Sequence, residues 1–466
     1  MAWTFSAYGD SVAALDDHGA SLTYTELEAE GDRLAAALGG RCLVFALCTN
    51  TLGSLIGYTA CICHHVVPLL LSAEIDPTLL DNLIEVYDPA YLWVPATHPA
   101  TTLGEAVYET RGYTLVRRTG AVPHELNDAL ALLLTTSGST GSPKLVRQSY
   151  DNVFSNATSI ASYLELDATE RPITTLPMNY TYGLSIINSH LLVGATLLLT
   201  ERGPLEREFW KFFREQEATS FGGVPYTYEI LERLRFRMMS LPSLRTMTQA
   251  GGKLSVDLHE RFAAYAAEQG KRFVVMYGQA EATARMGYLP AERAIEKRGS
   301  MGIAIPGGTL ELIDVDGSVI HEPGVVGELV YRGPNVTLGY AQCAADLALG
   351  DERHGVLQTG DMARFDEDGY FYITGRKKRF LKVFGNRVNL DELDRIAAHE
   401  FEGLECTCAG TDDHVVIYVT DEARAEDVRH LLSERTRLNL SAFSVRVIDA
   451  IPRNEAGKVL YKELPR

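Results

Sequence analysis

The chain has 466 residues, of which 46% are hydrophobic and 22% are charged, the composition of a folded globular protein long enough for two or three domains. It carries 61 acidic side chains against 43 lysines and arginines, which gives a formal charge of -18. Because nucleic acids and anionic membrane surfaces attract positive protein surface, this balance argues against either as a broad partner, although one basic pocket could still hold a small polyanion.

The N-terminal sequence MAWTFSAYGDSVAALDD has no basic leader followed by an apolar core, so we expect no signal peptide. The most apolar run, residues 55–71, contains two histidines and a proline, and we expect no stable membrane insertion. Seven scattered cysteines predict reduced thiols and a cytoplasmic location. Cys61 to His65 match no usual metal-ligand spacing, so we interpret them as part of a buried helix-to-strand segment.

From about residue 22 onward, helix-like and strand-like segments alternate. TYTELEAEGDRLAAAL, residues 23–38, places leucines at helical spacing between charged residues. The short apolar runs CLVFALC, AYLWVPA and ATLLLTE, which begin at residues 42, 90 and 195, are typical of buried strands. Buried strands that alternate with helices predict an α/β fold with largely parallel sheets.

The pattern changes between about residues 299 and 376, where Gly, Pro and Asp-Gly turns separate short alternating strands and predict hairpins. After the basic stretch GRKKRFLK, the tail has the pattern strand, helix, strand, and Val428, Leu431 and Leu432 share one helix face. We therefore expect a large domain over residues 1–376, with a β-rich part over 299–376, followed by a small α+β domain over 377–466.

The segment LLLTTSGSTGSPKL, residues 132–145, is the most distinctive loop of the chain. Gly138 and Gly141 permit backbone conformations in which successive N–H groups line a nest for an anion, and Lys144 adds a point charge suited to phosphate. The hydroxyl donors of this loop are Thr136, Ser137, Ser139 and Thr140. Taken alone, the loop could also be a polar surface turn. It matches neither the Walker pattern nor the dinucleotide fingerprint, so neither a P-loop NTPase nor an ordinary dehydrogenase fits.

Together with four later motifs, this loop resembles the adenylate-forming superfamily, which contains acyl-CoA synthetases, firefly luciferase and nonribosomal-peptide adenylation domains. TTSGSTGSPK is similar to the signature loop of that superfamily. The later motifs, in the order of the family, are MYGQAEAT, GELVYRGPNVTLGY, QTGDMARFDEDGYFYITGRKKR and PRNEAGKVLYKEL. The resemblance spans nearly the whole chain and implies stacked α/β subdomains, a β-rich subdomain and a small mobile C-terminal domain.

The resemblance implies an AMP-forming ligase. A carboxylate would attack the α-phosphorus of Mg-ATP, release pyrophosphate and form an acyl-adenylate, from which a thiol or another nucleophile would displace AMP. Positioning and charge neutralisation dominate chemistry of this kind.

The resemblance also implies roles for single residues. The glycine-rich loop and Lys144 would hold the β- and γ-phosphates, and Glu281 would bind Mg²⁺, a hard cation that prefers carboxylate and phosphate oxygens. Lys458 would bridge the carboxylate and the α-phosphate, although a lysine near the end of the sequence could also be merely solvated. The implied nucleotide-contacting residues are Gly251, Gly252 and Tyr277 for adenine, Asp361 and Arg376 for the ribose and phosphates, and Gly278 as a further ATP-binding residue.

Three further positions follow from the resemblance. Lys378 would be the hinge about which the small domain rotates, although a solvated basic linker fits the same residues. Gly385 would belong to the wall of a thiol tunnel. Ala280 departs from the family, which usually has threonine there, and we interpret this as a tuned site because every charged participant remains.

The acid pocket is expected to draw on residues 177–185, 221–228 and 249–252. Its candidate residues are Tyr180, Thr181, Tyr182, Phe221, Tyr226 and Gln249. In amino-acid-activating relatives an aspartate occupies about the place of Thr181, and no acidic residue lies between Pro177 and Ser185. Because an ammonium group without a carboxylate partner is costly to bury, an α-amino acid is disfavoured. The aromatic side chains favour a fatty or aryl acid, unless they are simply core residues.

The acceptor of the acyl group is expected to come in trans, because only eight residues follow Lys458 and leave no room for a fused carrier domain. CoA or the phosphopantetheine of a free-standing carrier protein is the leading acceptor. Two other classes of function stay open. One is an adenylate-forming amide or ester synthetase without a thiol step, and the other is a non-catalytic nucleotide-binding scaffold.

Overall fold

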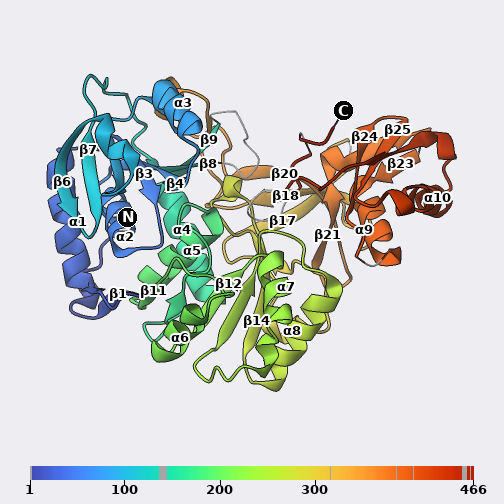
Figure 1. Ribbon diagram of the computed structural model, residues 1–466, viewed down its shortest axis with the longest axis horizontal. Helices are drawn as coiled ribbons and strands as arrows, with labels where there is room; N and C mark the ends of the chain where they lie inside the picture. Colours follow the sequence, from blue (N-terminus) through green and yellow to red (C-terminus); the bar gives the residue numbers. More distant parts are fainter. Residues whose placement is uncertain are drawn as a thin grey trace. The chain divides into compact units, whose positions relative to one another are not determined.

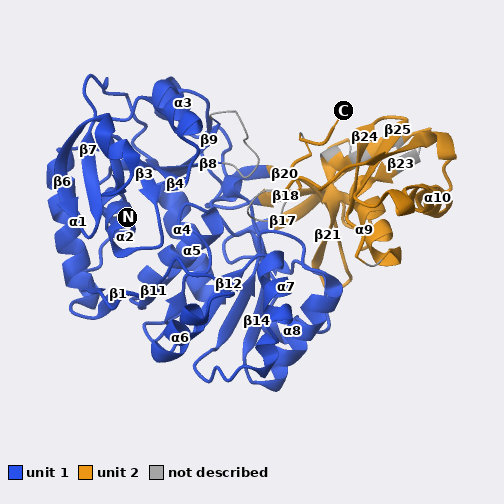
Figure 2. Ribbon diagram, in the orientation of Figure 1, with its two compact units in different colours: residues 1–309, 332–357 blue, residues 310–331, 358–466 orange. Residues whose placement is uncertain are grey.

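The computed structural model forms two compact units, coloured separately in Figure 2: residues 1–309 with 332–357, and residues 310–331 with 358–466. The expected boundary after Arg376 falls inside the second unit, because part of the β-rich segment clusters with the C-terminal residues. That the small domain rotates about a hinge near this boundary stays a prediction. The structure describes residues 3–135, 144–314, 316–384, 386–401, 403–453, 459–461 and 463–465.

The first unit contains a nine-stranded sheet with the order β16-β15-β14-β13-β12-β10-β11-β1-β2. Its central pairs, from β14 through β1, are parallel, and the pairs at its two ends are antiparallel. The strands are β1 Val12–Asp16, β2 Ser21–Thr23, β10 Pro172–Ile173, β11 Leu197–Leu199, β12 Ser220–Gly223, β13 Thr246–Gln249, β14 Arg272–Tyr277, β15 Gly287–Tyr288 and β16 Ile303–Ala304.

An eight-stranded sheet with the order β19-β9-β8-β4-β3-β5-β7-β6 completes the sheets of this unit. Its strands are β3 Leu43–Cys48, β4 Val67–Ser72, β5 Tyr91–Pro95, β6 Glu105–Thr110, β7 Tyr113–Arg117, β8 Leu130–Thr135, β9 Leu145–Ser149 and β19 Gly339–Ala341. Every residue of β3 is buried, because successive side chains face two different cores. Val44, Ala46 and Cys48 belong to one core, and Leu43, Phe45 and Leu47 belong to the other. This explains why the strand is a continuous apolar run.

Helices cover both faces of these sheets. α4 and α5 lie between the two sheets, and the core that they share with α1 and α2 takes side chains from β1, β3, β8 and β11 (Figure 1). The helices of the unit are α1 Tyr24–Leu38, α2 Leu52–Cys63, α3 Pro77–Tyr87, α4 Tyr150–Tyr163, α5 Thr181–Leu191, α6 Arg207–Glu215, α7 Pro225–Arg233 and α8 Val256–Glu268. α2 ends at Cys63 and β4 begins at Val67, which confirms the expected helix-to-strand connection, but its burial is confirmed only in part, because Cys61 is buried whereas His64 and His65 are exposed at the turn. Within the described ranges, no helix has both the length and the apolar character needed to cross a membrane.

The second unit combines a four-stranded sheet, β17-β18-β20-β21, with a C-terminal α+β segment. In that segment α9 and α10 pack on the sheet β24-β25-β26 around Leu393, Ile417, Val428 and Leu432. The elements are β17 Thr309–Ile313, β18 Gly327–Arg332, β20 Val356–Phe365, β21 Phe371–Arg376, β22 Phe380–Val383, β23 Asn386–Asn389, α9 Leu390–Glu400, β24 Cys406–Thr411, β25 His414–Val419, α10 Ala425–Thr436 and β26 Phe443–Val447. The order of β25, α10 and β26 is the strand, helix and strand expected from the sequence. The α/β fold class is confirmed.

Gly57 tests how tightly α2 packs on β5. A Cβ atom at this glycine would lie 2.1 Å from Nε1 of Trp93, whose indole already donates to the carbonyl of Gly53 at 3.0 Å. We expect Gly57→Ala to lower the free energy of unfolding by about 1–3 kcal/mol, because the buried indole must move. Urea denaturation measures this change. Gly350→Ala, where an added Cβ meets nothing within 4 Å, is the matched control, and equal midpoints for the two variants would contradict the packing argument.

Candidate active site

The loop after β14 carries Glu281, and buried side chains from residues 335–337 hold its backbone. Nδ2 of Asn335 donates to the carbonyl of Ala282 at 2.9 Å. The backbone N–H and the hydroxyl of Thr337 donate to the carbonyl of Glu281 at 3.1 and 3.0 Å. Asn335 and Thr337 are 1% and 0% exposed, so these bonds are shielded from water. The loop is therefore a rigid platform for the Glu281 side chain.

The Glu281 carboxylate is oriented by Tyr340, whose hydroxyl donates to Oε1 at 2.7 Å. Tyr340 lies on β19, which pairs with β9, and Lys144 directly precedes β9. Nζ of Lys144 lies 3.4 Å from the Tyr340 ring centroid, and the Arg353 guanidinium carbon lies 4.6 Å from it. Nη1 of Arg353 also donates to the carbonyl of Glu281 at 3.3 Å. The structure thus gathers one carboxylate and two cations around one aromatic ring.

The protonation of Tyr340 suits this arrangement. Burial and the adjacent Glu281 carboxylate raise the pKa of Tyr340, so its hydroxyl keeps its proton at neutral pH and donates to Oε1. Within the described part of the chain, Oε2 of Glu281 accepts no hydrogen bond. The Glu281 carboxylate is half-buried and has one oxygen that is available to a metal ion. With two cations beside it for phosphates, this carboxylate fits a Mg²⁺ ion whose remaining ligands are phosphate oxygens and water.

Several predicted residues lie outside the described part of the chain, and the structure leaves their roles as predictions. They are Thr136, Ser137, Gly138, Ser139, Thr140, Gly141, Gly385 and Lys458.

The predicted adenine wall is formed by backbone at the end of β13 and at the end of β14. Gly251 has φ +83, and a Cβ there would lie 2.6 Å from the Tyr180 hydroxyl, so only glycine fits. Gly278 is needed for a different reason, because its Cβ would lie 1.7 Å from the carbonyl oxygen of Ala284. Gly252 packs beside Pro225, and the Tyr277 hydroxyl accepts from Nε2 of Gln279 at 3.2 Å.

The predicted acid-pocket residues separate into two groups. Tyr180 and Thr181 lie at the start of α5, next to the platform loop, and the Thr181 hydroxyl donates to the carbonyl of Thr283. The buried Tyr182 hydroxyl bonds to Thr248 at 2.9 Å. Gln249 is 1% exposed, and among the described residues its Oε1 has no hydrogen-bond partner.

Phe221 and Tyr226 do not join that group. The Phe221 ring packs against Tyr228 and Phe236, at centroid distances of 6.4 and 5.8 Å. It therefore lies on the face of β12 opposite to Gly222, whose added Cβ would meet Tyr182. Tyr226, in the first turn of α7, is 47% exposed. Their part in a substrate pocket stays a prediction.

In the second unit, Asp361 of β20 and Arg376 of β21 are cross-strand partners. Nε of Arg376 lies 2.6 Å from Oδ1 of Asp361, whose side chain is buried while that of Arg376 is exposed. Lys378 lies in the short 3₁₀ turn Lys377–Arg379. Both ends of this turn are anchored by ion pairs, because Nζ of Lys377 lies 2.7 Å from Glu328 and Arg379 pairs with two aspartates of α9.

Sequence reasoning missed four residues that build the platform: Asn335, Thr337, Tyr340 and Arg353. The first three lie within the motif at 327–340, so the motif signalled their positions but not their partners. Arg353 belongs to no motif, and no sequence signal could have placed it beside Glu281.

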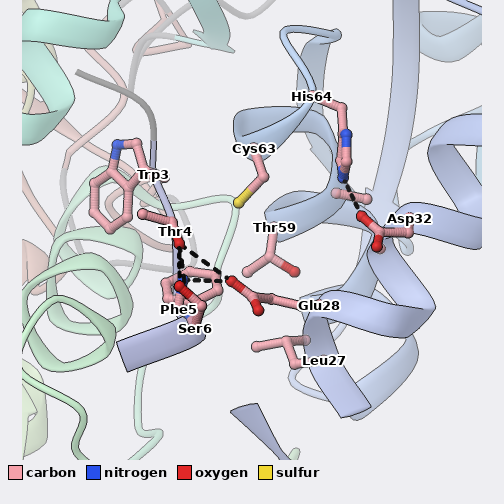
Figure 3. A pocket seen from close by; sticks show the side chains of 12 residues that line it. Trp3, Thr4, Phe5, Ser6, Leu27, Glu28, Asp32, Thr59, Cys63 and His64 are labelled. Carbon is pink, nitrogen blue, oxygen red and sulfur yellow. Dashed lines mark hydrogen bonds and ion pairs between the residues drawn. The ribbon is translucent and has the colours of Figure 1, made fainter. Parts of the chain in front are cut away.

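A separate hollow of about 320 Å³ lies between the N-terminal residues 3–6 and helices α1 and α2 (Figure 3). The Glu28 carboxylate accepts from the Phe5 N–H at 2.6 Å, and Asp32 lies 3.1 Å from His64. Burial and these acidic groups raise the pKa of the Cys63 thiol to about 12, which keeps it protonated and unreactive. Because a polyphosphate would meet two carboxylates here, we do not assign the nucleotide to this hollow.

The profile of the family described as AMP-binding enzyme matches residues 1–341. The 2-succinylbenzoate–CoA ligase of Bacillus licheniformis is 29% identical over 350 residues, which cover 73% of this chain and 70% of that protein. The indoleacetate–CoA ligase of Aromatoleum aromaticum is 30% identical over 342 residues, which cover 70% of this chain and 65% of the relative. O-Succinylbenzoate coenzyme A synthetase from Bacillus subtilis, in complex with ATP and magnesium ion, superposes with a TM-score of 0.79 at 22% identity, covering 99% and 98% of the two chains.

Tyr340→Phe tests whether Glu281 binds the metal ion. The substitution keeps the aromatic ring for Lys144 but removes the hydrogen bond that orients Oε1. We expect the Mg²⁺ concentration for half-maximal ATP-dependent pyrophosphate release to rise about tenfold, as for the loss of one hydrogen bond to a charged group.

Tyr58→Phe is the matched control for this variant. It removes a buried hydroxyl that donates to Asn188 at 2.7 Å instead of to Glu281, and we expect it to leave the Mg²⁺ dependence unchanged. An unaltered Mg²⁺ dependence in Tyr340→Phe would remove the reason to assign the metal ion to Glu281.

Proposed function

Because the chain belongs to the AMP-binding enzyme family, we propose that it is an AMP-forming ligase that activates an aryl acid with Mg-ATP and passes the acyl group to CoA. The observation that carries this proposal is the cluster of Lys144, Glu281, Tyr340 and Arg353 around one ring. In a chain with a formal charge of -18, this local cationic cluster supplies what a polyphosphate requires.

In the first half-reaction, the carboxylate oxygen of the acid forms a bond to the α-phosphorus, and the bond from that phosphorus to the pyrophosphate oxygen breaks. Lys144 and Arg353 would attract the phosphates, and Glu281, whose carboxylate accepts from the Tyr340 hydroxyl, would hold the metal ion. Mg²⁺ neutralises charge on the phosphate oxygens when it is bound. Since little covalent chemistry falls to the protein, fixed charges and a rigid loop are the main contributions that this chain can make.

The nucleoside is assigned to backbone and to one ion pair. Gly251, Gly252 and Tyr277 would border the adenine ring, and Asp361 would accept the ribose hydroxyls. The ion pair between Arg376 and Asp361 supports this role, because it fixes the position of a buried carboxylate whose oxygens can accept hydrogen bonds.

The acid is proposed to be aromatic and to lack an α-ammonium group. Thr181 stands where amino-acid-activating relatives carry an aspartate, and its hydroxyl is used by the carbonyl of Thr283. Tyr180 and Tyr182 offer aromatic surface beside it, with ring centroids 6.4 Å apart. The names of the two relatives, 2-succinylbenzoate–CoA ligase and indoleacetate–CoA ligase, both refer to acids that contain an aromatic ring.

CoA is the proposed acceptor, since the relatives are CoA ligases, and a free-standing carrier protein is the alternative thiol. Lys378 would be the hinge between the two half-reactions, and Gly385 would border the path of the thiol. We also propose a cytoplasmic location, which the free state of the cysteines supports.

Lys458→Ala tests the lysine assigned to the first half-reaction. We expect this variant to lose most acid-dependent pyrophosphate release, by at least about a hundredfold, while its thermal unfolding stays unchanged, because the lysine would neutralise charge that develops only in the transition state. Lys211→Ala is the control, since Lys211 is exposed and, among the described residues, its side chain makes only a long ion pair with Glu215. Full activity in Lys458→Ala would end the assignment.

The function itself is tested by pyrophosphate release with Mg-ATP across fatty, aryl and amino acids, each with and without CoA. We expect release with aryl acids, accelerated by CoA and accompanied by a thioester. Release that CoA leaves unchanged but an amine accelerates would select an amide synthetase. ATP binding without pyrophosphate release with any acid would leave a nucleotide-binding scaffold and contradict the proposal.

A further inference from the structure

Arg285, four residues after Glu281, is a buried cation that the mechanism does not use. Its side chain is 2% exposed. Its backbone is fixed from two sides, because Nδ2 of Asn156 and Nδ2 of Asn335 each donate to its carbonyl at 2.9 Å. The direction of its guanidinium is therefore set by the same loop that carries Glu281.

Every described group that touches the guanidinium is neutral. Nε and Nη2 donate to the Ser185 hydroxyl at 3.1 and 3.0 Å, and Nη1 donates to the Tyr163 hydroxyl at 3.2 Å and contacts the sulfur of Met276. The guanidinium carbon lies 4.4 Å from the ring centroid of Tyr182. Over the described ranges of the chain, no carboxylate lies within ion-pair distance of Arg285.

The other buried arginines of the described structure differ in this respect. Arg147, which is 0% exposed, pairs with Glu352 at 2.5 Å. Arg379, which is 8% exposed, pairs with Asp391 at 2.6 Å and with Asp394 at 2.5 Å. Buried charges in proteins are normally paired, since the low dielectric of the interior makes an uncompensated charge unfavourable. Among the residues that the structure describes, Arg285 therefore has no counter-anion, and a ligand could provide one.

The residues around the guanidinium indicate that the acid substrate could be this ligand. Ser185 and Tyr182 belong to α5, whose first residues Tyr180 and Thr181 are assigned to the acid pocket. Burial raises the pKa of Tyr180, and the charge of Arg285 opposes that rise, so the guanidinium acts on the Tyr180 hydroxyl as well. Tyr163 and Tyr180 are half-buried members of one apolar cluster that includes Met276. Arg285 thus lies among the tyrosines that pack beside the start of α5.

We propose that Arg285 selects acids that carry a second carboxylate, which it binds while the first carboxylate reacts at the α-phosphorus. This inference rests on the proposed function and narrows its substrate class to dicarboxylic acids with an apolar or aromatic body. A planar guanidinium can bind a carboxylate through two parallel hydrogen bonds. For this, Nε or Nη2 of Arg285 would exchange its hydrogen bond to the Ser185 hydroxyl for one to the carboxylate. The surrounding tyrosine rings exclude water and strengthen that ion pair.

The charge of Arg285 also acts on one buried histidine, His190. Burial, together with the charge of Arg285, lowers the pKa of His190 to about 4, so its ring carries no charge at neutral pH. An anion near Arg285 therefore interacts with one guanidinium and with neutral hydroxyl and aromatic groups.

The experiment compares acids in matched pairs: benzoate with isophthalate and with terephthalate, and hexanoate with adipate. For the wild-type protein we expect kcat/KM for pyrophosphate release to be at least about tenfold higher for one or more dicarboxylates than for the matched monocarboxylate. In Arg285→Met we expect that value to fall about a hundredfold for the preferred dicarboxylate and less than about threefold for its monocarboxylate partner. Arg285→Lys should retain part of the preference, since it keeps the charge but not the planar fork.

Arg171→Met is the matched control, because Arg171 is a half-buried arginine directly before β10 that donates to the carbonyl of Gln216. This variant should leave unchanged the ratio of kcat/KM between each dicarboxylate and its matched monocarboxylate. An equal loss for mono- and dicarboxylates in Arg285→Met would show that Arg285 serves the reacting carboxylate or the fold instead. A wild-type protein that prefers no dicarboxylate over its partner would overturn the proposal without any variant.

Calorimetric binding of the same acids, without ATP, separates this inference from the proposed function. Tighter binding of a dicarboxylate to the wild-type protein than to Arg285→Met would support the role of Arg285 even if no acid released pyrophosphate. Pyrophosphate release with monocarboxylates alone would support the ligase and reject the dicarboxylate preference. If Arg285→Met does not fold, the wild-type pairs and Arg285→Lys still decide the question.

Discussion

Two buried side chains, Asn335 and Thr337, hold the backbone of residues 281–285, and the candidate site depends on this contact. Their hydrogen bonds turn the carbonyl groups of the loop inward, which leaves the Glu281 carboxylate free to meet Tyr340. The loop is strained at Thr283, a β-branched residue at φ +65. The Thr283 hydroxyl donates to the carbonyl of Asn335 at 2.8 Å, so the same contact that orients the site also offsets the strain.

The candidate site gathers positive charge in a protein whose net charge is negative. The chain is strongly acidic as a whole, yet Lys144 and Arg353 flank one tyrosine ring, and Arg285 is buried a few residues from Glu281. Fixed charges inside a low-dielectric site act more strongly than the same charges on a solvated surface. An acidic surface and a cationic centre are therefore compatible, and the combination suits a ligase that handles a polyphosphate and an organic acid.

Local patterns predicted much of the fold. The helical spacing of 23–38 became α1, with Thr23 and Glu26 as its capping box, and the apolar run at 42–48 became β3. The aromatic candidates show where such reasoning stops. Phe221 and Tyr182 are both buried aromatic residues, and only the alternation along β12 separates the Phe221 ring from the side that Tyr182 occupies. Composition carries no information about which face of a strand meets a pocket.

By itself, the sequence determined the α/β class, the order of the motifs, the absence of an acidic residue at 181 and the identity of Lys144, Glu281, Asp361 and Arg376 as candidates. These conclusions are local, because they depend on residue type and spacing along one segment. The tertiary structure decided which distant residues become partners: Tyr340 with Glu281, Arg376 with Asp361, and Arg285 with Ser185 and Tyr163. Such pairs are separated by 15 to 122 residues in the chain, and only the packing of sheets and helices brings their polar atoms within hydrogen-bond distance.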